Sequence, residues 1–389
     1  MAISKDDKII LSSFIVAFCA FTSIYITQPL LPIIEQDLDV SSFQSSLSVS
    51  LVLAGITLGC IPSGVLDERI SLTSACLTAA ILLIVLHLAC AKTSNISVLI
   101  SLRFCQGFCI PFLTSSVASS LSRSVSRANI SRGIAWYVTA TILGGMSGRL
   151  LGGLTTIFYH WKFSFILSAF LVFLSCFFIP KLTPLPRKFS KVLKQTSYSA
   201  VIRNKNIWPS YFCAFLGQGI FSAVFNTIPF RLDSYPFNLS ADLISLLYMV
   251  YIVGLFTGPF TSMVTTKAGY QKTLFLGAII LAVGLLILLG RELYLAIIGL
   301  GCVCVGFFIV HINAAARLNG IVKTGLGEAN SLYMIWYYLG AFTGSLLAIL
   351  VLESKGWNTL ICLTLALLCV LTVSARETLS ATYQRQKQC

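Results

Sequence analysis

Long apolar stretches, separated by short polar segments, recur along the whole chain of 389 residues. Many hold about 18 to 22 residues without a charge, which is the length a helix needs to cross the hydrocarbon layer of a bilayer. That layer offers no hydrogen-bond partner to an open backbone, so each stretch is expected to form a helix. The first stretch has no small-residue cleavage site after it, so we interpret it as a retained span rather than a signal peptide.

Twelve such spans can be drawn, and little of the chain is left for a soluble domain. The pattern therefore predicts an all-α membrane protein with twelve transmembrane helices. The approximate spans are 9–32, 45–65, 73–91, 97–120, 134–157, 163–180, 207–230, 242–264, 273–290, 293–315, 330–351 and 357–374.

The two halves of the sequence resemble each other. A shift of 196 residues superposes "YVTATILGGMSGRLLGG" on "YMIWYYLGAFTGSLLAI", so that Gly144 falls on Gly340 and Gly148 on Gly344. Parallel repeats of this kind are related by an axis along the membrane normal and form two bundles that rock about a site between them. The sequence therefore predicts two six-helix pseudo-repeats.

The expected bundles are residues 1–180 and 206–389, with residues 181–205 as a linker. The chain is 57% hydrophobic and 10% charged, yet its formal net charge is +14. With the N-terminus placed inside, most Lys and Arg lie on the inner side, which indicates positive-inside topology and not a nucleic-acid-binding surface. The linker is basic and has no acidic residue, so it is expected to be cytoplasmic and to lie against anionic lipid headgroups.

Side chains that would indicate a metal site or catalysis are not grouped in the sequence. The 13 cysteines are scattered, and Cys302 and Cys304 would point in different directions on a helix. The sequence contains no Gly-Lys phosphate loop for ATP. We therefore expect neither a cofactor nor enzymatic activity.

Three motifs resemble those of the major facilitator superfamily. "LRFCQG" in the fourth span matches its R-x-x-Q-G element, "GVLDERIS" after the second span is similar to its G-x-L-x-D-R-x-G loop, and "GGMSGRLLGG" is similar to its fifth-helix antiporter element. With "YITQPLLP" and "IPFRLDSYPFNLS", the chain looks most like the YnfM-like branch of bacterial efflux permeases. The resemblance covers the whole chain and implies a monomeric secondary transporter of the bacterial inner membrane, with cytoplasmic termini and alternating access.

The same resemblance implies a gating or conformational role for the motif residues. In the loop after the second span, Glu68 stands where the family usually has Asp, and Ser71 replaces a glycine. The strength of a charged latch in this loop is therefore open. The residues concerned are Gly64, Asp67, Glu68, Arg69, Arg103, Gln106, Gly107, Gly144, Gly148 and Gly152.

Arg149 stands in the fifth span, about twelve residues or about 18 Å of helix from Trp161 at its outer end, and so lies near mid-bilayer. An arginine facing lipid there would cost at least about 2.5 to 3.5 kcal/mol on insertion scales, so we expect it to face the bundle interior. All Asp and Glu residues fall in loops or at span ends. The partner of Arg149 is therefore a backbone carbonyl, an amide such as Gln28, Asn226 or Asn313, or an anionic group of the substrate. A structural role and a substrate-binding role are both open.

Many proton-driven transporters carry the proton on an Asp or Glu within a helix. The predicted spans hold no such residue in their middle, so a proton carrier has to be sought elsewhere. The remaining candidates are His311 in the tenth span, Asp233 beside Arg231, and the loop acids Asp67 and Glu68. Histidine titrates near neutral pH. A helix-packing role for His311 is the alternative.

Aromatic residues crowd the eleventh span in "YMIWYY". Such a lining suits amphipathic or cationic molecules through stacking and cation–π contact, although helix packing accounts for part of it. The predicted substrate cavity is lined by Tyr25, Gln28, Arg149, Asn226, Arg231, His311, Asn313, Tyr333 and Tyr337.

The function predicted from these features is proton-coupled efflux of a small amphipathic compound or metabolite. One alternative is an uptake permease or exchanger for an organic anion that Arg149 and Arg231 bind. A membrane receptor that does not transport is a third hypothesis, but no loop is long enough for an added domain.

Overall fold

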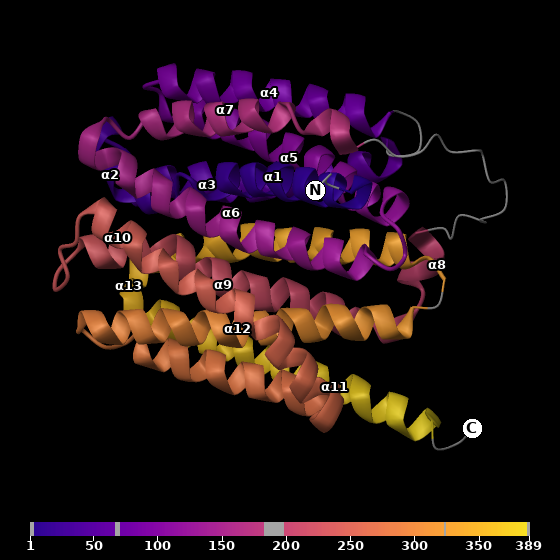
Figure 1. The fold of residues 1–389 in the computed structure, drawn as a ribbon. Coiled ribbons are helices and arrows are strands. Elements are labelled where there is room, and N and C mark those ends of the chain that lie inside the picture. Colours follow the sequence, from indigo (N-terminus) through magenta and orange to yellow (C-terminus); the bar gives the residue numbers. More distant parts are fainter. Residues whose placement is uncertain (1–3, 67–70, 183–197, 323, 387–389) are drawn as a thin grey trace. The chain divides into compact units, whose positions relative to one another are not determined.

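The structure is a computed structural model, and its described residues form helices and turns without a strand (Figure 1). The predicted all-α fold is confirmed. The described residues are 4–66, 71–182, 198–322 and 324–386.

Within these residues, eight helical segments are long and apolar enough to cross a membrane. Two of the eight, residues 241–287 and 326–373, are each interrupted by a glycine with a positive φ, Gly269 at 83° and Gly356 at 80°. Two further helices, Ile130–Phe158 and Phe163–Cys176, occupy the predicted fifth and sixth spans. The helices are therefore consistent with the twelve predicted spans, and the protein is a multi-pass membrane protein.

The chain divides into two compact units, Met1–Leu193 with Leu239–Met249, and Lys194–Asn238 with Val250–Cys389. The short segment Leu239–Met249 thus belongs to the first unit, although the sequence placed it in the second bundle. Of the predicted linker, residues 183–197 lie outside the described part of the chain.

The first unit contains the described helices from α1 to α7 and the short helix α10. Its elements are α1 (Lys5–Tyr25), a 3₁₀ turn (Gln28–Leu30), α2 (Leu31–Leu38), α3 (Ser42–Leu66), α4 (Leu72–Lys92), α5 (Ile96–Ser124), α6 (Ile130–Phe158), α7 (Phe163–Cys176), a 3₁₀ turn (Ile179–Leu182) and α10 (Ala241–Leu247).

The second unit contains fewer but longer helical elements. They are α8 (Tyr198–Ile202), a 3₁₀ turn (Lys205–Ile207), α9 (Trp208–Asp233), α11 (Gly254–Ile287), α12 (Leu293–Ile321) and α13 (Leu326–Gln386). A 3₁₀ turn (Tyr248–Val253) precedes α11 and contains the boundary between the two units.

The helix α1 ends at Tyr25, before the end of the predicted span 9–32, and the prolines of "YITQPLLP" explain why. Pro29 lies in the 3₁₀ turn after α1, and Pro32 lies in the first turn of α2. A proline has no N–H to continue a helical ladder but is tolerated in a first turn. The last carbonyls of α1 therefore need donors from elsewhere in the fold.

A ridge of glycines lets α6 approach α1 closely. A side chain at Gly144 or Gly148 would overlap the α1 carbonyl of Phe18 or Thr22, and one at Gly152 would overlap the carbonyl of Ile26, the residue that caps α1. The hydroxyl of Thr22 also donates to the carbonyl of Gly144 at 3.2 Å. Such contacts between small residues and backbone are how helices associate in a bilayer.

The second unit repeats this crossing between α9 and α13. A side chain at Gly340 would overlap the carbonyl of Phe215, and one at Gly344 would overlap that of Gly219. These are the glycines on which the 196-residue shift places Gly144 and Gly148. The repeat seen in the sequence therefore corresponds to a repeated helix contact.

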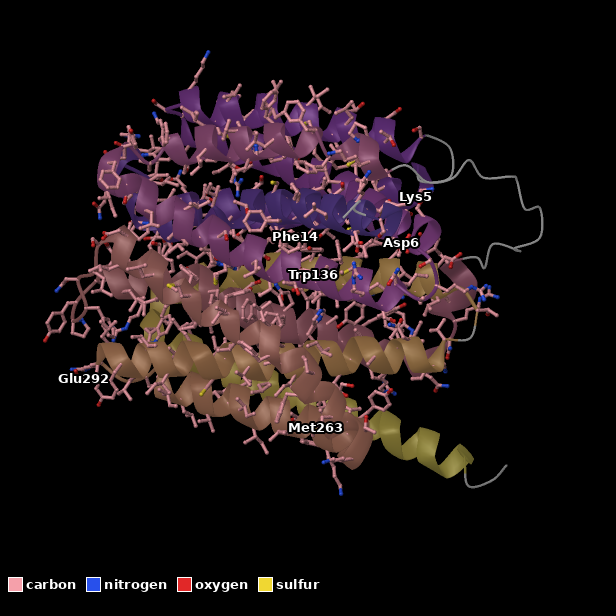
Figure 2. All side chains as sticks on the ribbon, viewed as in Figure 1. Lys5, Asp6, Phe14, Trp136, Met263 and Glu292 are labelled. Atoms are coloured by element: carbon pink, nitrogen blue, oxygen red, sulfur yellow. The ribbon has the colours of Figure 1, made fainter. Side chains whose placement is uncertain are left out.

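On the N-terminal side of the first glycine contact, aromatic rings pack α1 against α6. Phe14 of α1 meets Trp136 of α6 edge to face, with ring centres 5.8 Å apart (Figure 2). Trp136 is 48% exposed. One side of its ring therefore packs on Phe14 of α1, and about half of the side chain stays exposed.

Candidate substrate and gating sites

Arg149 is buried in the first unit, together with two of its predicted neighbours. Its Nε donates to Oε1 of Gln28, and its Nη1 donates to the carbonyl of Gly145 at 2.8 Å. Its Cζ lies 3.9 Å from the ring centre of Tyr25 and 5.3 Å from that of Tyr248. These contacts give the charge the polar and aromatic surroundings that a buried guanidinium requires.

The position of Tyr248 could not be expected from the sequence. It follows α10 in the part of the chain assigned to the second half, yet its segment packs on α6 of the first unit. Gly153 of α6 permits this packing, because a side chain there would overlap Ser245 and the carbonyl of Ala241. Arg149 therefore contacts both α1 and the segment Leu239–Met249.

Arg103 is fully buried in α5, and all five of its N–H donors are used. Its partners are the carbonyls of Ser23, Ile24 and Ser48, at 3.1, 2.7 and 3.0 Å, and the side chains of Thr27 and Gln106, at 3.2 and 2.6 Å. Two of these carbonyls belong to the last turn of α1, which ends before Pro29. Arg103 therefore holds the broken end of α1 against α3 and α5.

Two neighbours of Arg103 extend this network to α4. Gln106 donates from Nε2 to Sγ of Cys90 at 3.3 Å. Gly107 lies against α3, because a side chain there would overlap the carbonyl of Val52. Arg103, Gln106 and Gly107 therefore act together as helix-packing residues, while the gating role implied by the family stays a prediction.

A buried histidine that the sequence does not single out lies near Arg103. His87 of α4 is fully buried, with Nδ1 2.7 Å from the carbonyl of Leu83 and Nε2 2.9 Å from the hydroxyl of Ser168. Since a carbonyl can only accept, Nδ1 carries the proton and Nε2 accepts from Ser168. Ser168 in turn lies 3.0 Å from the hydroxyl of Ser23. A lone histidine in an apolar span gives no sequence signal for these partners.

In the second unit the structure brings His311, Tyr333 and Tyr337 together. Nδ1 of His311 lies 3.0 Å from the hydroxyl of Tyr333, which also donates to the carbonyl of His311 at 3.2 Å. The imidazole stacks on Phe307 with ring centres 5.8 Å apart and lies 4.9 Å from the ring of Tyr337. Phe307 and Tyr333 are buried, whereas His311 and Tyr337 are partly exposed.

The other predicted cavity residues of the second unit have separate partners. Asn226 donates to the hydroxyl of Ser345. Asn313 donates to the carbonyl of Tyr270 at 2.6 Å and accepts from Thr265 at 3.3 Å.

Arg231 lies near the end of α9. Its Nη1 donates to the carbonyl of Tyr235 at 3.1 Å, and its Cζ lies 5.2 Å from the ring centre of Phe237. Its Nε is buried and has no hydrogen-bond partner among the described residues. Arg231 is thus a predicted cavity residue with a buried N–H, at Nε, that has no acceptor among the described residues.

The predicted charged loop cannot be placed. Gly64 lies in α3, but Asp67, Glu68 and Arg69 lie outside the described residues. The latch that the family resemblance implies for this loop stays a prediction.

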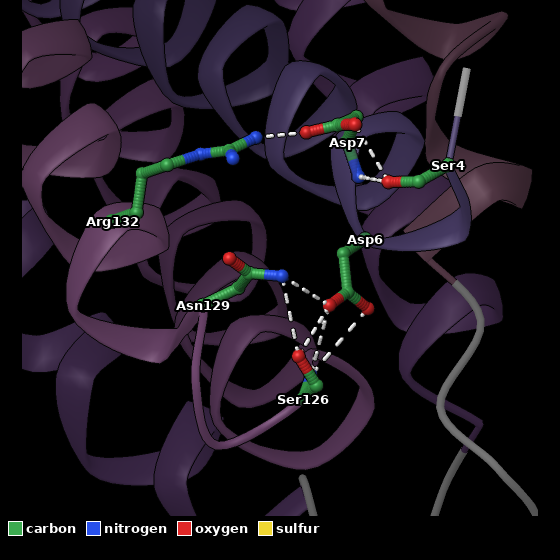
Figure 3. Close-up of polar contacts among 6 residues, drawn as sticks. All are labelled: Ser4, Asp6, Asp7, Ser126, Asn129 and Arg132. Atoms are coloured by element: carbon green, nitrogen blue, oxygen red, sulfur yellow. Dashed lines mark hydrogen bonds and ion pairs between the residues drawn. The ribbon is translucent and has the colours of Figure 1, made fainter.

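A different polar cluster joins the beginning of α1 to the beginning of α6 (Figure 3). The carboxylate of Asp6 accepts from the backbone and hydroxyl of Ser126 and from the side-chain amide of Asn129, the latter at 2.8 Å. Asp7 pairs with Arg132. Because Asn129 precedes the first residue of α6, Asp6 places a negative charge at the positive end of that helix.

We expect Asp6→Asn to lower the Tm of the purified protein more than Asp7→Asn. Asp6 holds several donors and lies near a helix dipole, whereas the Asp7–Arg132 pair joins two half-exposed side chains, and such pairs stabilise little. Thermal unfolding of both variants beside the wild type measures the difference. An Asp7→Asn variant with the lower Tm would contradict this ranking.

Comparison with known proteins identifies the family. The model of the Major Facilitator Superfamily matches residues 13–316. An uncharacterized transporter of Buchnera aphidicola subsp. Schizaphis graminum is 27% identical over 87% of this chain and 83% of its own length. The inner membrane transport protein YnfM of Escherichia coli is 25% identical over 90% of this chain and 85% of its own length.

A solved structure has the same fold. It is that of a bacterial homologue of the human lysosomal transporter Spinster, in an inward-facing and unoccupied conformation, with a TM-score of 0.71 and 14% sequence identity. The alignment covers 98% of this chain and 95% of that one. The family match over most of the chain confirms the resemblance seen in the motifs, and this protein belongs to the Major Facilitator Superfamily.

Proposed function

We propose that this secondary transporter exports a small amphipathic compound in exchange for protons. The observation that carries the proposal is the aromatic cluster around His311. Phe307 and Tyr333 are buried behind His311 and Tyr337, which are partly exposed. Aromatic faces bind amphipathic and cationic molecules, and an imidazole among them is a group that can take up a proton.

The hydrogen bonds of His311 determine which nitrogen would exchange that proton. Since the Tyr333 hydroxyl donates to the carbonyl of His311, its oxygen is free to accept from Nδ1–H. The basic nitrogen is then Nε2, for which no hydrogen bond occurs within the described residues. We infer that protonation at Nε2 and binding of a cationic substrate beside it exclude each other, which is the requirement for exchange.

The contacts of Arg149 support this proposal over transport of an anion. Its guanidinium is already surrounded by Gln28, Gly145 and two tyrosine rings. A structural role that holds α6 to α1 therefore accounts for its burial. The alternative, an organic-anion permease or exchanger, is favoured by one observation only, the unmet Nε of Arg231.

We further propose that the protein works as a monomer in the bacterial inner membrane, with both termini in the cytoplasm. The bacterial relatives and the inner excess of Lys and Arg support this orientation. In the same proposal the basic linker 181–205 binds anionic lipid, and substrate crosses the membrane by alternating access.

The test uses purified protein in liposomes with an acidic interior and ethidium outside. Because protons leave down their gradient, wild-type protein is expected to accumulate the dye, and a protonophore to abolish the accumulation. His311→Gln should reduce gradient-driven accumulation to that of protein-free vesicles and keep dye-for-dye exchange at equal pH. His160→Gln, which changes an exposed histidine, is the matched control.

Two other results would contradict parts of this proposal. Gradient-driven accumulation that persists in His311→Gln removes His311 as the proton carrier. A preparation that ignores ethidium but exchanges succinate, and loses that exchange in Arg231→Gln, supports the anion alternative and overturns the efflux proposal.

A further inference from the structure

A third buried arginine, Arg317, lines a cavity in the second unit. Arg317 of α12 is only 8% exposed, and its Nη1 has a single weak partner, the hydroxyl of Ser210 at 3.4 Å. Its Nη2 is buried and has no hydrogen-bond partner. Among the residues that the structure describes, Arg317 also forms no ion pair.

The cavity beside Arg317 is small and lies between three helices. Its volume is about 10 Å³, and it is lined by Ser210 and Cys213 of α9, Tyr270 of α11, and Asn313 and Arg317 of α12. This is the volume within which the centre of a water-sized sphere can lie, so the space admits one water molecule or one monatomic ion. A polyatomic substrate therefore cannot enter it whole.

The polar groups around the cavity are mostly donors. Nη2 of Arg317 has two unused N–H groups, and the hydroxyl of Ser210 accepts from Arg317 and so keeps its own hydrogen to donate. Ser210 is the third residue of α9, a helix of 26 residues, so the positive end of that helix dipole adds to the charge of Arg317. The carboxamide of Asn313 is occupied by Tyr270 and Thr265.

We propose that this cavity is a binding site for a single monatomic anion, namely chloride. A water molecule would satisfy donors but leave the guanidinium charge uncompensated in a buried place, whereas an anion meets both requirements. The anion bridges α9 and α12 through Ser210 and Arg317. It thereby stabilises the second unit, at a cavity whose lining does not include His311, Tyr333 or Tyr337.

The experiment measures the Tm of the full-length protein in detergent while sodium chloride replaces sodium gluconate at constant ionic strength. The Tm is expected to rise and saturate with chloride and with bromide, because a ligand that binds only the folded state raises its stability. Arg317→Gln should remove this dependence. Arg291→Gln, an exposed arginine between α11 and α12, is the matched control and should keep it.

Ser210→Ala provides a second variant in case Arg317→Gln does not fold. It removes one donor to the anion, so the chloride concentration at half-saturation should rise by at least about tenfold. Equal Tm values in chloride and gluconate for the wild type, as a water-filled cavity would give, overturn the proposal. A chloride response that Arg317→Gln or Ser210→Ala leaves unchanged overturns it as well.

Discussion

Replacing Arg103 by Gln is expected to leave little or no folded protein. The variant loses the donors to Ser23, Ile24 and Ser48 at a fully buried site. Each buried carbonyl left without a partner costs about 1 to 3 kcal/mol. Together these losses are a large share of the stability of a typical domain, about 5 to 15 kcal/mol. The yield of monodisperse protein in size-exclusion chromatography, and the Tm of any folded fraction, measure the effect.

Two further variants separate the loss of hydrogen bonds from the loss of charge. Arg103→Lys keeps a positive charge but has one nitrogen instead of a planar fork, so its Tm should fall between those of the wild type and Arg103→Gln. Arg132→Gln removes an arginine that is 51% exposed, a change worth about 0 to 1 kcal/mol. Folded Arg103→Gln with the Tm of the wild type would refute the structural role given to this residue.

The fold was predictable from the sequence because the bilayer enforces helices wherever a long apolar stretch occurs. The boundaries of those stretches were less certain. The predicted tenth span ends at residue 315, before the next charged residue, whereas α12 continues to Ile321 and buries Arg317. A prediction from hydrophobicity ends a span before a charged residue. Tertiary packing can bury such a residue near a helix end, so the helix itself can continue past it.

The site was predictable only in its residue types. Gln28 was one of several amides that could meet Arg149, and the pairing across 121 residues depends on how α1 crosses α6. Tyr248 was not predicted at all, because no periodicity indicates that its segment packs on the first unit. Asp6, which pairs with the loop before α6, was similarly missed, since its partners are 120 and 123 residues away.

Gly148→Val and Gly344→Val are both expected to destabilise the protein, each by about 3 kcal/mol, with the larger loss at Gly148→Val. A side chain at Gly148 would overlap the carbonyl of Thr22, and one at Gly344 would overlap the backbone of Gly219. A backbone cannot rotate away as a side chain can, so each pair of helices must separate and lose its packing. Thermal unfolding and the yield of monodisperse protein measure both variants.

Gly301→Val is the matched control, because a side chain there meets nothing within 4 Å in the described residues. Its stability should stay within about 0.5 kcal/mol of the wild type. A neutral Gly148→Val would mean that α1 and α6 do not depend on close backbone contact. The two crossings also differ in one respect: Thr22 donates to Gly144 in the first unit, whereas glycine occupies the corresponding position 219 in the second. Separation of α1 from α6 therefore also lengthens a hydrogen bond, so Gly148→Val should be the more damaging of the two.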